Sequence, residues 1–406
     1  MRLLVLLTST FPYGGGEDFL ATEVRYISGF DRVLICPCNR KPGSGITKRV
    51  PEGIRVVPLQ RREAGKTAYA GLLLRPYVLR EAARLLRGGR RFPQRLHEML
   101  FFMKNAAEIH EALRAIPEFR EAGELTIYSY WFYDAAAAAA LLAGEWKKRG
   151  KRVRFISRAH GFDIYPERAR YGYLPMRPFL LDRVDRLYPC SPQGARAICS
   201  RYPEYAGKVR PALLGTEDRG VAGGRREPEF HLVSCSYMVP VKRLHLIVEA
   251  LRLSDFPIRW THLGSGPLEE ELRRRAGDLP AHIRAEFPGA MSNEEVLRYY
   301  RGHAVSAFVN VSASEGIPVS VMEAISFGLP VLATDVGGNA EAVRDGETGY
   351  LLKKNFEPAA LMEKIRLLRD LPREQYDRLC AGARSLWERK FSARENYGKF
   401  YEEISR

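Results

Sequence analysis

The stretch "SASEGIPVSVMEAISFGLPVLATDVGGNAEAVRDGETGYLL", residues 312–352, decides the fold of this chain. The apolar run just before it, at 305–312, predicts a β-strand, and "VSVMEAISFG" at 319–328 predicts a helix. Pro318 stands where the first turn of a helix tolerates proline. Glu315 therefore falls in a strand-to-helix loop, and Glu323 falls about one to two turns into the helix.

The start of this helix has the features of an anion site. Main-chain N–H groups at the beginning of a helix lack carbonyl partners, and the positive end of the helix attracts phosphate. The residues concerned are Gly316, Ile317, Pro318, Val319 and Ser320. Carboxylates beside such a site suit a ligand that also carries hydroxyl groups, as a sugar and a ribose do.

Strand-like and helix-like segments alternate along the chain, which predicts an α/β protein with parallel sheets. The predicted strands are 2–9, 31–37, 54–59, 125–131, 152–159, 186–191 and 208–214, then 231–237, 258–264, 305–312 and 330–335. We predict a first domain at 1–214, a linker rich in Gly and charge at 215–229, a second domain at 230–390, and a final helix at 391–406 that packs back on the first domain. Ligands of such sheets bind at the carboxyl ends of strands, so we expect the site in a cleft between the halves.

The composition is that of a globular chain. Of 406 residues, 46% are hydrophobic and 28% charged, which suits two or three domains. No apolar run approaches the ~20 residues of a membrane span, and "MRLLVLLTSTFP" is interpreted as a first strand rather than a signal peptide. The six cysteines lack the spacing of a zinc site or of a disulfide scaffold, so we expect them to be reduced and the protein to be cytoplasmic.

Positive charge is concentrated in the first half. Residues 1–214 hold 37 Lys and Arg against 20 Asp and Glu, whereas the remainder is close to neutral. An arginine-rich solvated surface, an anionic membrane surface and an anionic acceptor are all compatible with this excess. Nucleic acid is not an expected partner because the chain has no recognised nucleic-acid motif.

The two glutamates resemble the signature of a known family. Seven residues separate Glu315 from Glu323, and Gly-x-Pro follows the first. This pattern is similar to that of the retaining nucleotide-sugar glycosyltransferases of family 4, and the resemblance covers essentially the whole chain. It implies the GT-B fold, in which two doubly wound, Rossmann-like domains face one another across a cleft. It also implies that Glu315 contacts the hydroxyls of the donor sugar and that Glu323 holds the ribose hydroxyls.

Other segments of the second half match the family in order. "SCSYMVPVKRLHLIVEAL" at 234–251 resembles the first strand and helix of the donor domain, which implies that Lys242 neutralises the donor diphosphate. The family commonly has an arginine where this chain has Tyr237, and we predict that Arg243 supplies the missing cation. "HLGSGPLEEEL" at 262–272 resembles a turn of the donor domain, and "TDVGGNAEAV" at 334–343 resembles a loop that closes the donor pocket.

The nucleotide base is expected beside "FPGAMSNEEVLRYYR" at 287–301. There the resemblance implies main-chain contacts from Gly289, Ala290 and Met291.

The first half supplies two further candidates. His160, in "SRAHGFDIY", occupies the place of a histidine that the family directs at the donor sugar, and it follows a predicted strand. In "PYGGGEDF" at 12–19, the glycines, including Gly15 and Gly16, allow main-chain amides to approach donor phosphate or acceptor. The alternative for these glycines is a flexible loop.

The resemblance implies transfer of a sugar from a nucleoside-diphosphate sugar to a glycan or lipid-linked glycan, in cell-surface polysaccharide or glycolipid biosynthesis. No DxD pattern is present, so we expect neither a metal nor a resident cofactor. Two alternatives remain open: a sugar-nucleotide 2-epimerase with a GT-B fold, and a non-catalytic subunit that binds a sugar nucleotide.

A basic segment of the first half suggests where the protein acts. Residues 72–104 interleave arginines with leucine and aromatic residues. A basic amphipathic region of this kind binds anionic lipid through apolar burial and charge, which predicts a peripheral protein on the inner face of the plasma membrane. A solvated helix is the alternative.

Overall fold

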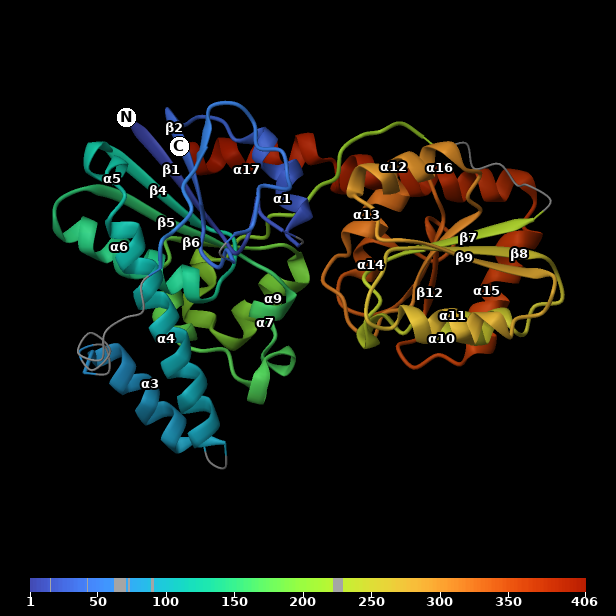
Figure 1. Cartoon of the computed structure of the whole chain (residues 1–406), viewed down its shortest axis with the longest axis horizontal. Helices are drawn as coiled ribbons and strands as arrows, with labels where there is room; N and C mark the ends of the chain where they lie inside the picture. The colour runs from blue at the N-terminus through green and yellow to red at the C-terminus, as the bar shows by residue number, and fades with distance from the viewer. Residues whose placement is uncertain (15, 42, 62–70, 72–73, 89–90, 222–228) are drawn as a thin grey trace. The chain divides into compact units, whose positions relative to one another are not determined.

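The computed structural model describes residues 1–14, 16–41, 43–61, 71, 74–88, 91–221 and 229–406. The chain divides into two compact units, the first formed by Met1–Leu213 with Gly398–Arg406 and the second by Leu214–Tyr397. Figure 1 shows a sheet in each unit with helices on both of its faces.

The sheet of the first unit has six parallel strands in the order β3-β2-β1-β4-β5-β6. The strands are β1 (Arg2–Thr8), β2 (Arg32–Pro37), β3 (Ile54–Val56), β4 (Glu124–Ser129), β5 (Arg152–Ala159) and β6 (Arg186–Pro189). The order of strands reverses between β1 and β4, and this switch point is where doubly wound sheets bind their ligands.

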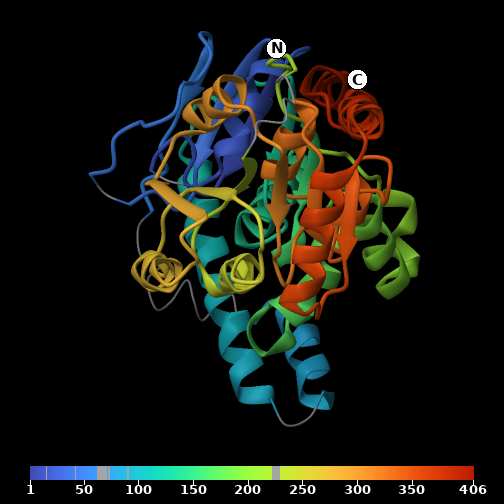
Figure 2. The same cartoon turned by 90° about the vertical axis from the view of Figure 1, so that its right-hand side faces the viewer.

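Helices cover both faces of this sheet. They are α1 (Asp18–Glu23), α3 (Pro76–Arg87), α4 (Phe92–Arg114), α5 (Glu118–Glu121), α6 (Asp134–Lys148), α7 (Gly161–Ile164), α8 (Arg177–Arg183) and α9 (Pro192–Arg201). The alanine run of α6 is buried and packs beside α4. Phe400 and Tyr401, near the end of α17 (Ala393–Ser405), are buried in the first unit beside Tyr128 of β4. Figure 2 shows α3 and α4 extending side by side away from the sheet.

The sheet of the second unit is also parallel and six-stranded, in the order β12-β11-β10-β7-β8-β9. Its strands are β7 (Phe230–Cys235), β8 (Ile258–Leu263), β9 (Ile283–Gly289), β10 (Ala307–Asn310), β11 (Val331–Thr334) and β12 (Gly349–Leu352). In Figure 1, α12 (Asn293–Gly302), α13 (Val319–Ser326) and α16 (Arg373–Lys390) lie on one face, and α10 (His245–Leu251), α11 (Glu269–Gly277) and α15 (Pro358–Asp370) lie on the other. The short α14 (Asn339–Ala342) follows β11. The order of strands reverses between β7 and β10.

The predicted fold class, an α/β chain with two doubly wound parallel sheets, is confirmed. One predicted strand is wrong: 208–214 makes a single bridge, Leu187 to Val209. Arg210 and Ala212 donate main-chain hydrogen bonds to Leu187 and Pro189 of β6, but Pro189 has no N–H with which to donate back and continue the ladder. Two strands were not predicted, β9 and β12. Both are edge strands, only one residue of β9 is buried, and edge strands do not need the apolar pattern of a central strand.

Within the described ranges, no helix combines the length and the apolar character that spanning a bilayer requires. The six cysteines, all of them described residues, are not in disulfides, and each is buried or half-buried.

Candidate functional site

The switch point of the second sheet brings Lys242 and Glu315 together. Lys242 lies in the loop after β7, and Glu315 lies in the loop after β10, which is the neighbour of β7 in the sheet. The Nζ atom of Lys242 is 2.6 Å from Oε1 of Glu315. The sequence predicted both residues for the site, and their strands place them at the same edge of the sheet.

Two polar side chains from the end of β10 hold the Glu315 carboxylate. Ser312 Oγ donates a hydrogen bond to Oε1 at 2.6 Å, and Asn310 Nδ2 donates to the same oxygen at 3.2 Å. Glu315, Ser312 and Asn310 are all buried, whereas Lys242 is half-buried. Because a buried carboxylate requires charge-assisted hydrogen bonds, this set fixes its position.

The Gly-Gly pair after β11 permits a close approach to the Glu315 loop. A Cβ on Gly338 would lie 2.7 Å from the Gly316 carbonyl oxygen, and one on Gly337 would overlap the carbonyl of Glu315. Gly338 donates its N–H to the Gly316 carbonyl at 2.7 Å. These glycines are therefore required by packing between two main-chain segments, and they place the 334–343 loop against Glu315.

Glycines also permit a close main-chain approach to the loop that contains Lys242. This loop runs from β7 through a short 3-10 helix, Pro240–Lys242, to α10. A Cβ on Gly264 would lie 2.2 Å from the Ser236 carbonyl oxygen, and one on Gly266 would lie 2.6 Å from the main-chain nitrogen of Met238. The Gly-x-Gly turn after β8 thus packs its main chain directly against the segment that leads to Lys242.

Arg243 adopts a left-handed conformation with φ 49°. Its guanidinium donates to the main-chain carbonyls of Val311 at 2.9 Å, Ser312 at 3.2 Å and Lys354 at 2.8 Å. The same group lies over the ring of Phe356, and burial lowers the pKa of Arg243. The side chain thus braces the end of β10, and its predicted contact with a diphosphate stays a prediction. Tyr237 is 62% exposed.

The start of α13 lies next to this pair. Pro318 precedes the first helical residue, Val319, so the first-turn N–H groups at Val319 and Ser320 have no carbonyl partner within the helix. Gly316 is exposed, whereas Ile317 and Pro318 are buried.

Glu323, also in α13, is buried and accepts a hydrogen bond from Nδ2 of Asn293, the first residue of α12. The segment that holds Gly289, Ala290 and Met291 links β9 to α12, so it leads directly to this contact.

His160 lies in the first unit, just beyond β5, and caps α7. Its Nε2 atom is 3.1 Å from the Tyr130 carbonyl oxygen, and its Nδ1 atom is 3.1 Å from the Cys190 sulfur. Burial, assisted by the charge of Arg158, lowers the pKa of His160 to about 3, so the imidazole is neutral at pH 7. Asp163 accepts the main-chain N–H of His160, and burial raises the pKa of Asp163 to about 7.

The glycine loop after β1 is anchored. Gly14 and Gly16 both have positive φ, and a Cβ on either would meet no atom within 4 Å. Thr47 Oγ1 and Lys48 Nζ each donate to the Gly14 carbonyl at 2.9 Å, and Lys48 also donates to the Gly16 carbonyl. Gly15 lies outside the described residues.

Several residues at the two switch points were not predicted: Asn293, Asn310, Ser312, Glu17 and Trp131. Asn310 and Ser312 lie just before Glu315 in "NVSASE", where short polar residues directly after a buried strand are a usable signal. Asn293 follows Ser292 in the capping box of α12, which is also visible in "SNEE".

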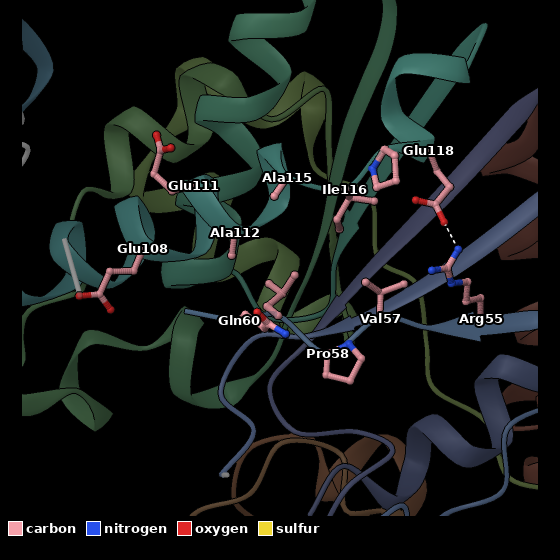
Figure 3. Close-up of a pocket in the computed structure, with 12 residues that line it drawn as sticks. Arg55, Val57, Pro58, Gln60, Glu108, Glu111, Ala112, Ala115, Ile116 and Glu118 are labelled. Carbon is pink, nitrogen blue, oxygen red and sulfur yellow. Dashed lines mark hydrogen bonds and ion pairs between the residues drawn. The ribbon is translucent and has the colours of Figure 1, made fainter. Parts of the chain in front are cut away.

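A separate pocket lies along β3 and the ends of α4 and α5. Figure 3 shows Arg55 and Glu118 facing one another on its wall, and they form an ion pair. Oε2 of the buried Glu118 has no hydrogen-bond partner. Of the predicted site residues that the structure describes, none lines this pocket.

Among the described residues, no group of three or more His, Cys, Asp and Glu side chains is arranged to hold a metal ion.

Residues 219–385 match the family model described as Glycosyl transferases group 1, so the match lies within the second unit. The chain is 28% identical over 236 residues to "Putative colanic acid biosynthesis glycosyltransferase WcaL" of Salmonella typhimurium, covering 55% of this chain and 57% of that protein. It is 26% identical to D-rhamnosyltransferase WbpZ of Pseudomonas aeruginosa, covering 54% of this chain and 59% of that protein. The chain therefore spans less than two thirds of the length of these curated relatives.

The fold is similar to that of Alr3699/HepE from Anabaena, solved in complex with UDP and glucose. The TM-score is 0.68 at 15% identity, with 99% of each chain covered. This likeness concerns the fold. The enzyme class predicted from the sequence, a glycosyltransferase, agrees with the family match and with the names of the relatives.

Proposed function

We propose that this protein is a retaining glycosyltransferase of family 4 that transfers a sugar from a nucleoside-diphosphate sugar to a hydroxyl of a glycan or lipid-linked glycan. The observation that carries the proposal is the Lys242–Glu315 pair at the switch point of the second sheet, 2.6 Å apart and next to the start of α13. The family match over the same unit supports it, as do relatives named for polysaccharide biosynthesis.

The site residues have the chemistry for such a transfer. The Lys242 ammonium and the first-turn N–H groups of α13 would stabilise the departing diphosphate, because fixed donors act most strongly where charge develops. Glu315 would accept hydrogen bonds from hydroxyls of the donor sugar, and Glu323 from the ribose hydroxyls. The bond from the anomeric carbon to the phosphate oxygen breaks as the acceptor oxygen bonds to the same face, and the acceptor proton passes to the leaving phosphate.

The main-chain groups of Gly289, Ala290 and Met291 would lie beside the base, since their segment leads to the Asn293–Glu323 contact. His160 and the loop of Gly14 and Gly16 would act from the first unit, which would bind the acceptor. We further propose that the reaction needs no metal ion.

Thermal stabilisation by UDP, GDP, ADP and their sugars, measured on the wild type and on Glu323→Ala, tests the donor site. A ligand that binds only the native state raises the unfolding temperature by mass action. We expect one nucleotide to stabilise the wild type selectively and to lose this effect in the variant. Absence of stabilisation by every nucleotide, in protein that is folded, would contradict a donor site.

Turnover of the stabilising nucleotide sugar distinguishes the three activities left open by the sequence. A transferase releases nucleoside diphosphate faster when an acceptor is added, a 2-epimerase converts the donor with no acceptor, and a binding subunit does neither. Glu315→Ala should abolish transfer while the fold remains intact, and unchanged turnover would overturn the assignment of the site.

We also propose that the protein binds the inner face of the plasma membrane through α3 and α4. Leu79 and Leu86 are 52% and 62% exposed on α3, and Phe101 is 55% exposed on α4. Arg80, Arg84 and Arg87 are exposed on α3 next to the leucines. Apolar burial and attraction to anionic lipid act together on such a surface, each near-surface charge contributing about 1 kcal/mol.

Co-sedimentation with vesicles tests the membrane proposal. Binding to phosphatidylglycerol vesicles should exceed binding to phosphatidylcholine vesicles and fall in Leu79→Ser/Leu86→Ser. If the wild type remains in the supernatant with anionic vesicles at low salt, the membrane proposal fails and the transferase proposal stands.

A further inference from the structure

The switch point of the first sheet also holds a buried carboxylate, that of Glu17. Glu17 directly precedes α1, has a left-handed conformation with φ 53°, and is 7% exposed. Its Oε1 accepts the main-chain N–H of Ser9 at 2.9 Å, and its Oε2 accepts those of Thr10 and Phe11 at 2.7 Å each. The carboxylate therefore binds three consecutive amides that follow β1.

The same carboxylate fixes an aromatic side chain from the neighbouring strand. Trp131 follows β4, and its Nε1–H donates to Glu17 Oε1 at 2.6 Å. The indole ring is centred 4.4 Å from the ring of His160 and 5.3 Å from that of Phe162, which is 44% exposed. Glu17 thus connects the loops that follow β1, β4 and β5.

Two features of Glu17, its backbone conformation and its buried carboxylate, each cost free energy. A left-handed conformation costs a non-glycine residue roughly 1–2 kcal/mol, and a buried carboxylate has to recover its lost hydration through hydrogen bonds. The four N–H donors supply these bonds, and the Thr10 hydroxyl adds a longer one at 3.4 Å. A capping side chain would accept hydrogen bonds from the N–H groups of its own helix. The Glu17 carboxylate instead accepts them from a loop and from an indole at the ligand-binding edge of the sheet.

We infer that Glu17 is a positioning residue, which holds residues 9–11 and the Trp131 indole in one fixed arrangement beside His160 so that the first unit presents a preformed surface to the acceptor. This inference rests on the proposed function. It assigns to Glu17 an effect on the affinity for the acceptor, with no contact to the donor. Thr47 and Lys48 donate hydrogen bonds to the Gly14 carbonyl, so the loop after β1 is held at Gly14 as well as at residues 9–11.

The test compares Glu17→Gln with Glu118→Gln in the full chain. Glu118 is also a buried glutamate of the first unit, but it pairs with Arg55 at the edge strand β3. In Glu17→Gln, one oxygen becomes an amide NH2 that opposes the N–H donors. Hydrogen exchange at the amides of Ser9, Thr10 and Phe11 should become at least about tenfold faster, because hydrogen bonds to a charged group are lost. Glu118→Gln should leave these amides unchanged.

Kinetics supply the second readout, with octyl glucoside, octyl galactoside and octyl mannoside as acceptor probes. On whichever probe the wild type glycosylates, Glu17→Gln should raise the acceptor KM about tenfold while the Kd for the nucleotide stays within twofold. Trp131→Phe, which removes only the indole N–H, should raise the KM in the same direction.

The outcomes separate this inference from the proposed function. Unchanged exchange at residues 9–11 in Glu17→Gln overturns the inference even if the protein is an active transferase. An equal rise of acceptor KM in Glu118→Gln, or a parallel loss of nucleotide affinity in Glu17→Gln, also overturns it. Absence of nucleotide binding by the wild type contradicts the proposed function instead, and the exchange measurement then still decides whether Glu17 holds residues 9–11 in place.

Discussion

The two sheets stabilise a buried carboxylate at their switch points with different partners. Each places a buried glutamate there, Glu315 in the second unit and Glu17 in the first. Glu315 pairs with the half-buried cation Lys242, whereas Glu17 accepts hydrogen bonds from main-chain amides and an indole. Lys242 of the second unit is only half-buried, whereas the carboxylate in the first unit is bound by its own loop and by Trp131.

The loops around the two glutamates are also held differently. In the second unit, Gly264, Gly266, Gly337 and Gly338 let main-chain segments touch one another, and a Cβ at any of them would overlap a neighbour. In the first unit, side chains such as Glu17, Trp131 and Lys48 hold the loops. Packing between main chains requires glycine, whereas a side-chain anchor can be replaced by other residue types.

The largest expected effect is the loss of kcat when the cation that pairs with Glu315 is replaced. Lys242→Met should lower kcat by about 10²–10³, because the leaving diphosphate loses a fixed charge. Lys48→Met in the first unit provides the comparison: it loosens the Gly14 loop and should change turnover only a few-fold. Steady-state kinetics of both variants measure this. Equal losses would contradict the contrast between a catalytic and a structural lysine.

The two units should respond differently to acid. Burial lowers the pKa of His262 in β8 from 6.5 to about 4. Its Nδ1 lies 2.8 Å from Ser234 Oγ, and its Nε2 lies 3.1 Å from the Ser236 carbonyl, an arrangement that fits the neutral ring. The unfolded chain takes up a proton below pH 6.5 and the native chain does not, so stability is lost as pH falls from 6.5 towards 4.

Urea unfolding at pH 7 and pH 5 measures this effect. His262 should account for about 2 kcal/mol of lost stability between these values, and His262→Gln should remove that part of the pH dependence. In the first unit, His160 acts in the same direction, but Asp163 opposes it. The pKa of Asp163 is raised from 3.8 to about 7, so the native state binds this proton more tightly than the unfolded chain does. Its contribution to stability is therefore lost as pH rises and regained as pH falls. Identical pH dependence in the wild type and His262→Gln would refute the assignment.

A loss of stability of similar size tests the need for glycine where the 334–343 loop approaches Gly316. Gly338 has an ordinary φ of −92°, so Gly338→Ala isolates steric overlap from backbone strain. We expect a loss of about 1–3 kcal/mol and weaker nucleotide binding, because the loop shifts away from Gly316. Gly302→Ala, where a Cβ meets nothing within 4 Å, is the matched control. Thermal unfolding with and without nucleotide measures both. Equal behaviour of the two variants would count against the packing argument.

The smallest effect on stability is expected at Arg243. Arg243→Gly relieves the left-handed strain but loses the bonds to three carbonyls, so the net change should lie within about 1 kcal/mol. Hydrogen exchange around residues 311–316 should nevertheless become faster. If nucleotide affinity falls as far as in Lys242→Met, the guanidinium contacts the diphosphate and the bracing role is wrong.

The sequence predicted the parts of the fold that depend on apolar patterning. The central strands β1, β4, β7 and β10 are buried on both faces and stood out as apolar runs. The edge strand β9 did not, because charged residues interrupt its apolar residues, and β12 did not, because it is only four residues long. The segment 208–214 was wrongly predicted as a strand because its apolar residues resemble one, and because Pro189 of β6 lacks the N–H that a continuous ladder would need.

The candidate site was predictable where the spacing of residues along the chain fixes their positions on a strand end or a helix. Glu315 and Glu323 follow from the positions of a strand end and a helix, whereas Lys242 was predicted only from the resemblance of its segment to the family. The partners of these residues were less predictable, because Asn293 reaches Glu323 from a different helix and Arg243 turns to carbonyls more than 60 residues away. Glu17 escaped notice for a related reason: only the fold brings its carboxylate to Trp131, 114 residues later in the chain.

The most direct test of a donor site in the second unit is hydrogen exchange of the full chain with and without the nucleotide that stabilises it. We predict slower exchange in the peptides that contain Lys242, residues 289–293 and residues 316–323, with no change at residues 9–17. Protection at residues 9–17 with none around Glu315 would contradict this account and would place the nucleotide on the first unit.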